Sequence, residues 1–97
     1  MGKNNQSLGI YRYSESFGRM GDLAGVFVAD ASDVAKAMGR EVHLGEVLGK
    51  HSEVIATISE NTVKLVTRDR VAVEVVQSLD LAVGTNPLDY LEDEDAA

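Results

Sequence analysis

The residues with the greatest chemical potential lie in GREVHLGEVLGKHSE, residues 39–53, which holds both histidines of the chain. Its imidazole and carboxylate groups can bind zinc or another divalent ion, and they can also transfer protons. The candidates are His43, Glu46, His51 and Glu53. Their spacing matches no standard metal motif, and strand alternation would place His43 and Glu46 on opposite faces of a sheet. We therefore predict no metal, no cofactor and no catalytic residue, with a small histidine- and glutamate-dependent hydrolase or metal-binding protein as the alternative.

The second half of this segment, LGKHSE, has the composition of a ligand-binding loop. It combines a flexible glycine, a cation, two hydrogen-bonding side chains and a carboxylate, namely Gly49, Lys50, His51, Ser52 and Glu53. The adjacency of Ser52 and His51 does not define a nucleophile and its base, because neighbours in sequence fix no geometry. The loop is thus predicted to bind a ligand without catalysis, and an exposed polar turn with incidental ion pairs is the alternative.

A glycine-rich stretch, FGRMGDLAG at residues 17–25, is the second candidate for ligand binding. Gly18 and Gly21 leave the backbone bare around Arg19, so the loop can present amide groups and a guanidinium to an anion. It lacks the lysine and hydroxyl residue of a phosphate-binding P-loop and the spacing of a dinucleotide fingerprint. If it lies beside LGKHSE, Arg19 and Lys50 form a basic spot for a phosphate or carboxylate. Glycines that only permit a tight connection are the alternative.

The aromatic residues near the start of the chain form a third candidate. Tyr11, Tyr13 and Phe17, with Arg12, have the composition of an interface anchor. Tyrosines that complete a small core are the alternative. A strand at residues 8–13 could also form a sheet edge, which would favour a homodimer or a higher homo-oligomer by strand pairing.

Composition excludes several classes of function. The chain has 97 residues, 44% of them apolar and 26% charged, which fits one soluble domain. It has no cysteine, so it has no disulfide and no thiolate zinc site. No apolar run approaches the roughly 20 residues of a membrane span, and the polar N-terminus does not resemble a secretory signal. We predict a cytoplasmic protein that does not associate with membranes.

Charge is distributed unevenly along the chain. The net charge is −7, which argues against direct nucleic-acid binding. Five of the 16 acidic residues lie beyond Leu88, so the rest of the chain carries 11 acids against nine bases. We predict one domain at residues 1–88, with 1–7 flexible, and an acidic tail at residues 89–97. The tail is a solvating appendage or, alternatively, an acidic mimic of nucleic acid.

The first half of the chain predicts two strands and a helix. LGIYRY at 8–13 alternates like a strand, and LAGVFVA at 23–29 is a buried strand in which Gly25 indicates a bulge or a close backbone approach. The residues between them form a loop or a wide hairpin connection. Asp30 or Ser32 caps a short helix that ends at Gly39.

The second half predicts three strands and another helix. Residues 41–45 and 54–58 read as strands, and 63–67 is predicted to pair with 54–58 as a hairpin across SENT. Residues 67–79 fit either periodicity, and a helix is favoured because its polar side chains then share one side. Asn86-Pro87 starts a short terminal turn. The predicted fold is α+β: a small, mainly antiparallel sheet of about five strands with two helices packed on one face.

Three stretches together resemble the small, uncharacterised proteins encoded by bacteriophages and prophages, without a named family. They are FGRMGDLAGVFVAD, GREVHLGEVLGKHSE and the terminal NPLDYLEDEDA. The resemblance implies action by binding, either by blocking a host defence protein or by sequestering a small nucleotide signal. The combined prediction is a non-enzymatic binding protein for a host protein or a small anionic, nucleotide-like ligand. The predicted site is Arg19, Gly21, His43, Lys50, His51, Ser52 and Glu53.

Overall fold

The computed structural model describes residues 7–49 and 53–91. Within these ranges it contains strands, two α-helices and two short 3-10 helices. In chain order they are β1 (Leu8–Ser16), η2 (Gly18–Met20), β2 (Asp22–Asp30), α1 (Ala31–Ala37), β3 (Glu41–Gly45), β4 (Val54–Thr57), β5 (Val63–Thr67), α2 (Arg70–Ser78), β6 (Val83–Gly84) and η3 (Pro87–Tyr90). The α+β class is confirmed, and the described residues form six strands where about five were predicted.

The main sheet has the strand order β5-β1-β2-β6 and is antiparallel throughout. β1 and β2 form a long hairpin, in register from Leu8 opposite Asp30 to Ser16 opposite Asp22. The prediction that the first strand is a sheet edge is wrong, because β5 and β2 flank β1 on its two sides. Strand pairing through β1 is therefore not available to a second copy.

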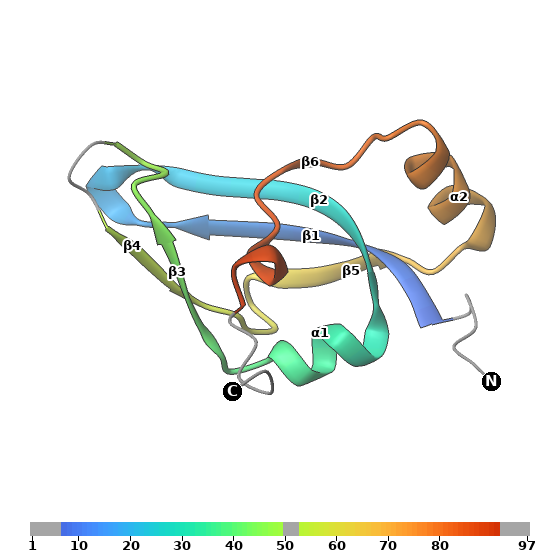
Figure 1. Ribbon diagram of the computed structural model, residues 1–97, viewed down its shortest axis with the longest axis horizontal. Helices are drawn as coiled ribbons and strands as arrows, with labels where there is room; N and C mark the ends of the chain where they lie inside the picture. The colour runs from blue at the N-terminus through green and yellow to red at the C-terminus, as the bar shows by residue number, and fades with distance from the viewer. Residues whose placement is uncertain (1–6, 50–52, 92–97) are drawn as a thin grey trace.

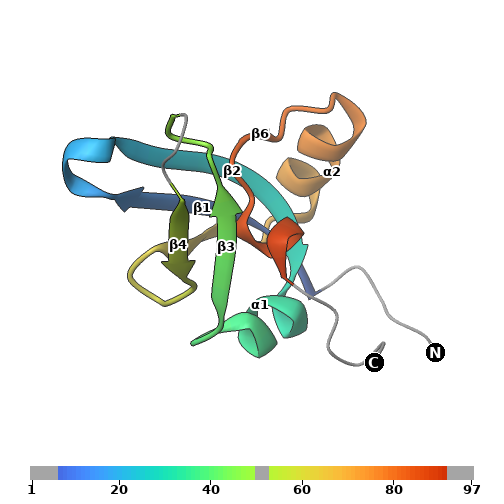
Figure 2. The same ribbon diagram turned by 60° about the vertical axis from the view of Figure 1, so that its left-hand side comes forward.

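β3 and β4 form a second, two-stranded sheet, in which Val42 lies opposite Ala56. Figure 2 shows this hairpin running across the direction of β1 and β2. The predicted pairing of 54–58 with 63–67 is wrong, because β5 pairs with β1, with Val63 opposite Tyr13. The turn at residues 59–62 redirects the chain: the amide of Ser14 donates to the carbonyl of Thr62 at 2.9 Å and ties the turn to the main sheet.

The core fills the space between the two sheets. Tyr11, Tyr13 and Phe27 project from one face of the main sheet, here called the inner face, and the Tyr11 and Phe27 rings stack with centroids 6.0 Å apart. Tyr11 and Tyr13 are 5% and 0% exposed, so they belong to the core and do not form the predicted interface anchor. The opposite, outer face carries Arg12 and its alternate neighbours.

The two helices cover different parts of the sheet (Figure 1). Val34 and Ala37 of α1 join the inner-face core, and the side chain of Asp30 caps this helix by accepting from the amide of Ser32 at 2.8 Å. α2 is the predicted helix, and the side chain of Asp69 caps it by accepting from the amide of Ala72 at 3.0 Å. Its one buried residue, Val73, lies outside the inner core cluster. Val73 lines a small cavity together with Leu8. Leu8 lies an odd number of residues before Tyr11 and Tyr13 on β1, so its side chain is on the opposite side of the strand from theirs. α2 thus covers a different part of the sheet from α1.

The last described segment crosses the sheet edge and returns to the core. β6 pairs with β2 at Gly25 and Gly84, where a Cβ on Gly25 would overlap the carbonyl oxygen of Thr85. This is the close backbone approach that the glycine predicted. Asn86 caps η3, and Leu88 and Leu91 pack against the core. The described ranges contain no helix with the length and apolar character that crossing a bilayer requires.

Candidate functional site

Two cations lie directly opposite each other on the outer face of the main sheet. Arg12 on β1 pairs in register with Lys64 on β5, and both side chains are exposed. Like charges at directly opposed positions of an antiparallel pair destabilise the sheet. The arrangement therefore costs stability unless an anion lies between or above the two side chains.

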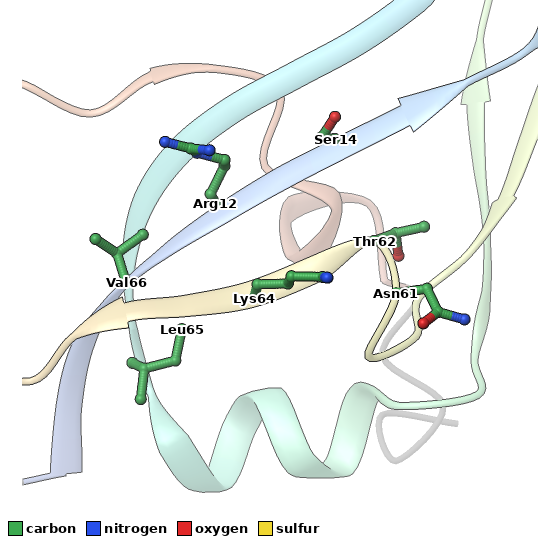
Figure 3. A pocket seen from close by; sticks show the side chains of 7 residues that line it. All are labelled: Arg12, Ser14, Asn61, Thr62, Lys64, Leu65 and Val66. Atoms are coloured by element: carbon green, nitrogen blue, oxygen red, sulfur yellow. The ribbon is translucent and has the colours of Figure 1, made fainter.

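A groove of about 480 Å³ surrounds this pair (Figure 3). Its lining is basic, hydroxylic and apolar, and consists of Arg12, Ser14, Asn61, Thr62, Lys64, Leu65 and Val66. Figure 3 shows Arg12, Ser14 and Val66 on one side of the sheet, whereas Leu65 points to the other side. The groove thus offers two positive charges, neutral hydrogen-bonding groups and one apolar side chain on one surface.

The turn at one end of the groove is fixed by its own hydrogen bonds. The amide of Ser59 donates to Oγ1 of Thr62 at 3.2 Å, and the amide of Asn61 donates to Oγ of Ser59 at 3.2 Å. The amide of Val63 also donates to the carbonyl of Ser59, at 2.9 Å. These bonds hold Asn61 at the rim with its side chain exposed. A ligand would meet a preorganised edge there.

No acidic group neutralises the two cations within the described part of the chain. Neither Arg12 nor Lys64 forms an ion pair or a side-chain hydrogen bond with a residue of the described ranges. Glu15, the acid nearest to Arg12 on β1, alternates to the inner side and accepts a hydrogen bond from the hydroxyl of Tyr13 at 2.9 Å. Burial, followed by this bond and by the charge of Glu15, raises the pKa of the Tyr13 phenol well above its ordinary range.

The glycine loop of the predicted site lies at the turn between β1 and β2. Arg19 is exposed in η2 and has no ion-pair partner among the described residues. Gly21 has a φ of 121°, and a Cβ there would lie 3.4 Å from Cδ2 of Leu48. The loop therefore lies beside Leu48, the first residue of LGKHSE. Lys50, His51 and Ser52 lie outside the described residues, so their role stays a prediction.

The remaining predicted residues lie on the exposed side of the β3–β4 hairpin. His43 alternates with the buried Val42 and Leu44, and its side chain is 59% exposed. Its Nε2 is 3.9 Å from Oε1 of Glu41, a surface contact that contributes little to stability. Glu53 is exposed just before β4. Residues 7–49 and 53–91 contain no group of three histidine, cysteine or acidic side chains placed to hold a metal.

A second groove, of about 290 Å³, lies between α1 and η3. Its charged lining mixes both signs, with Asp33 beside Lys36 and Arg40, and Leu88 and Leu91 form its apolar wall. The acid offsets one of the two cations, so the preference for an anion is weaker here than at Arg12 and Lys64. Among the described grooves, the one at Arg12 and Lys64 has the clearer chemical preference.

Sequence reasoning did not find this groove, although it singled out Arg12. Side chains alternate between the two faces of a strand, so the sequence at 8–13 already places Arg12 on the opposite face from Tyr11 and Tyr13. The partner Lys64 could not be identified, because the expected pairing of 63–67 with 54–58 would have kept it away from β1. Comparisons of the chain with protein-family models, curated proteins and solved structures gave no match. Function must therefore be inferred from the chain's own residues.

Proposed function

We propose that this protein binds, without catalysis, a small anionic ligand of the nucleotide type in the groove at Arg12 and Lys64. The observation that carries the proposal is the directly opposed cation pair with no acid of the described chain beside it. An anion seated there would turn a destabilising pair into a favourable one. The volume of about 480 Å³ lies within the usual range for small-molecule sites, roughly 300–1,000 Å³.

The side chains of the groove suit the parts of a nucleotide. Arg12 can bind two phosphate oxygens with its planar fork, and Lys64 adds a point charge beside it. Ser14 and Asn61 can hydrogen-bond to sugar or base edges. Val66 offers an apolar surface at 54% exposure. The lining holds no carboxylate, imidazole or thiol that would activate its hydroxyls, which supports binding over hydrolysis.

A binding role of this kind agrees with the resemblance to phage-encoded proteins. Sequestering a nucleotide signal of a host defence system requires affinity alone. An acidic side chain of a host protein would satisfy the same two cations, but the groove dimensions favour the small ligand.

Calorimetric titration of the full chain with mono-, di- and cyclic nucleotides tests the proposal. We expect Arg12→Ala and Lys64→Ala each to weaken binding by roughly 10-fold or more, since each removes a charge-assisted contact of about 1.5–3 kcal/mol. Lys36→Ala, on α1, is the matched control and should bind normally. Arg19→Ala tests the glycine-loop site directly. Loss of binding in Arg19→Ala with normal binding in Arg12→Ala would refute the groove and place the site at the glycine loop.

A further inference from the structure

The two opposed cations belong to a longer row of residues on the outer face of the main sheet. Lys64 lies opposite Arg12, and on its other side Arg12 lies opposite Val26 of β2. Val26 in turn lies opposite Val83 of β6. Directly opposed residues of antiparallel strands point to the same face, so these four side chains share the outer face. The row crosses all four strands, with two cations at one end and two valines at the other.

The valine end of the row is held in place and is accessible. β6 approaches β2 closely at Gly25 and Gly84, because neither residue has a Cβ. Next to this crossing, Val83 is 63% exposed and Val26 is half-buried. The crossing thus provides a fixed apolar surface that a ligand can cover.

The spacing along the row suits a small molecule with one anionic and one apolar part. Neighbouring strands lie about 4.8 Å apart, so Arg12 is roughly 7 Å from the midpoint between Val26 and Val83. A phosphate on the cations and a base over the valines would be joined by one sugar across that gap. The base is the part of a nucleotide with broad apolar faces, and covering the valines with it removes apolar surface from water.

The charge of the groove matches that of a single phosphate. Arg12 and Lys64 supply two positive charges, and the described lining contains no acid. A phosphate monoester carries about −1.5 to −2 charges near neutral pH. Nucleoside di- and triphosphates are commonly bound with Mg²⁺, which proteins hold through carboxylates together with the phosphates. The described lining offers no carboxylate for such an ion, so the groove favours a monophosphate.

We propose, resting on the nucleotide function proposed above, that the ligand is a nucleoside monophosphate with its phosphate on Arg12 and Lys64 and its base over Val26 and Val83. Charge complementarity selects the anionic end of the ligand. Continuity of the row from the cations to the valines selects the position of the base. The nucleotide site thus extends beyond the groove, across β2 to β6.

Calorimetric titration of the full chain with adenosine monophosphate and ribose 5-phosphate tests the position of the base. The wild type should bind the nucleotide more tightly than the sugar phosphate. Val83→Ser should weaken binding of adenosine monophosphate roughly fivefold and leave that of ribose 5-phosphate within about twofold, because only the nucleotide has a base to cover the valine. Val71→Ser, at a 65%-exposed position on α2, is the matched control and should bind both normally. Circular dichroism checks that each variant is folded.

Val66→Ser tests the competing position for the base, because Val66 is the apolar residue beside Lys64 on the same face. A larger loss of nucleotide affinity in Val66→Ser than in Val83→Ser would overturn the base position and leave the groove in place. Tighter binding of adenosine triphosphate in excess Mg²⁺ than of adenosine monophosphate would overturn the single phosphate. A wild type that binds no nucleotide would refute the proposed function itself, and this ligand with it.

Discussion

Lys64→Glu should make the protein more stable and at the same time abolish ligand binding. In the structure Lys64 lies directly opposite Arg12, so the wild type sets two like charges against each other on an exposed face. The substitution replaces this repulsion by an attractive pair in the same register. Directly opposed charges contribute roughly 0.2–1 kcal/mol of either sign.

The expected gain is about 1 kcal/mol in the free energy of unfolding, after allowance for solvent screening of exposed pairs. For a domain of this length, that corresponds to a rise in melting temperature of about 4–8 °C. Lys64→Gln removes the repulsion without creating the pair, so its stability should fall between those of the wild type and Lys64→Glu. Added salt should narrow the differences, because it screens surface charges.

Urea unfolding followed by circular dichroism measures the effect, since the chain has no tryptophan to report by fluorescence. Nucleotide titration of the same samples measures binding. Lys36→Glu on α1 is the control for adding an acid in place of an exposed lysine. A Lys64→Glu protein that is less stable than wild type would refute the inferred repulsion, and one that binds nucleotide normally would refute the groove.

Three further predictions concern the strand crossing, the core tyrosine and the tail. Gly25→Ala should lower the free energy of unfolding by at least about 2 kcal/mol, because the new methyl overlaps the backbone of Thr85, and urea melts measure it. Because the folded state raises the pKa of Tyr13, its contribution to stability should be complete below the ordinary tyrosine pKa of about 10, and the free energy of unfolding should then fall by about 1.4 kcal/mol per pH unit. Alkaline unfolding curves would show this fall in the wild type but not in Tyr13→Phe. Deleting residues 92–97 should leave nucleotide affinity unchanged when measured by calorimetry; a loss of function would favour the acidic-mimic alternative.

Local sequence patterns determined most of the elements. Asp30 and Asn86 each cap the helix or turn that their side chains predicted, because capping needs only the neighbouring amides. Gly25 likewise predicted a close backbone approach. A glycine within a strand indicates such an approach whichever segment of the chain comes close to it. The alternation of side chains along the strand also placed Arg12 on the opposite face from the buried Tyr11 and Tyr13. These are properties of short segments, and a short segment carries enough information to fix them.

Tertiary structure alone decided which strands pair and where charges meet. The segments 54–58 and 63–67 fit a hairpin with each other as well as they fit their actual partners, because alternation specifies a face but not a neighbour. The choice follows from burial: Val54 and Ala56 complete the core between the two sheets, and β5 is left to extend the main sheet beside β1. That pairing brings Lys64 opposite Arg12 and creates the groove. His43 and Arg19 have the side-chain chemistry of a binding site, but the convergence of side chains on one site depends on long-range packing, which local spacing does not encode.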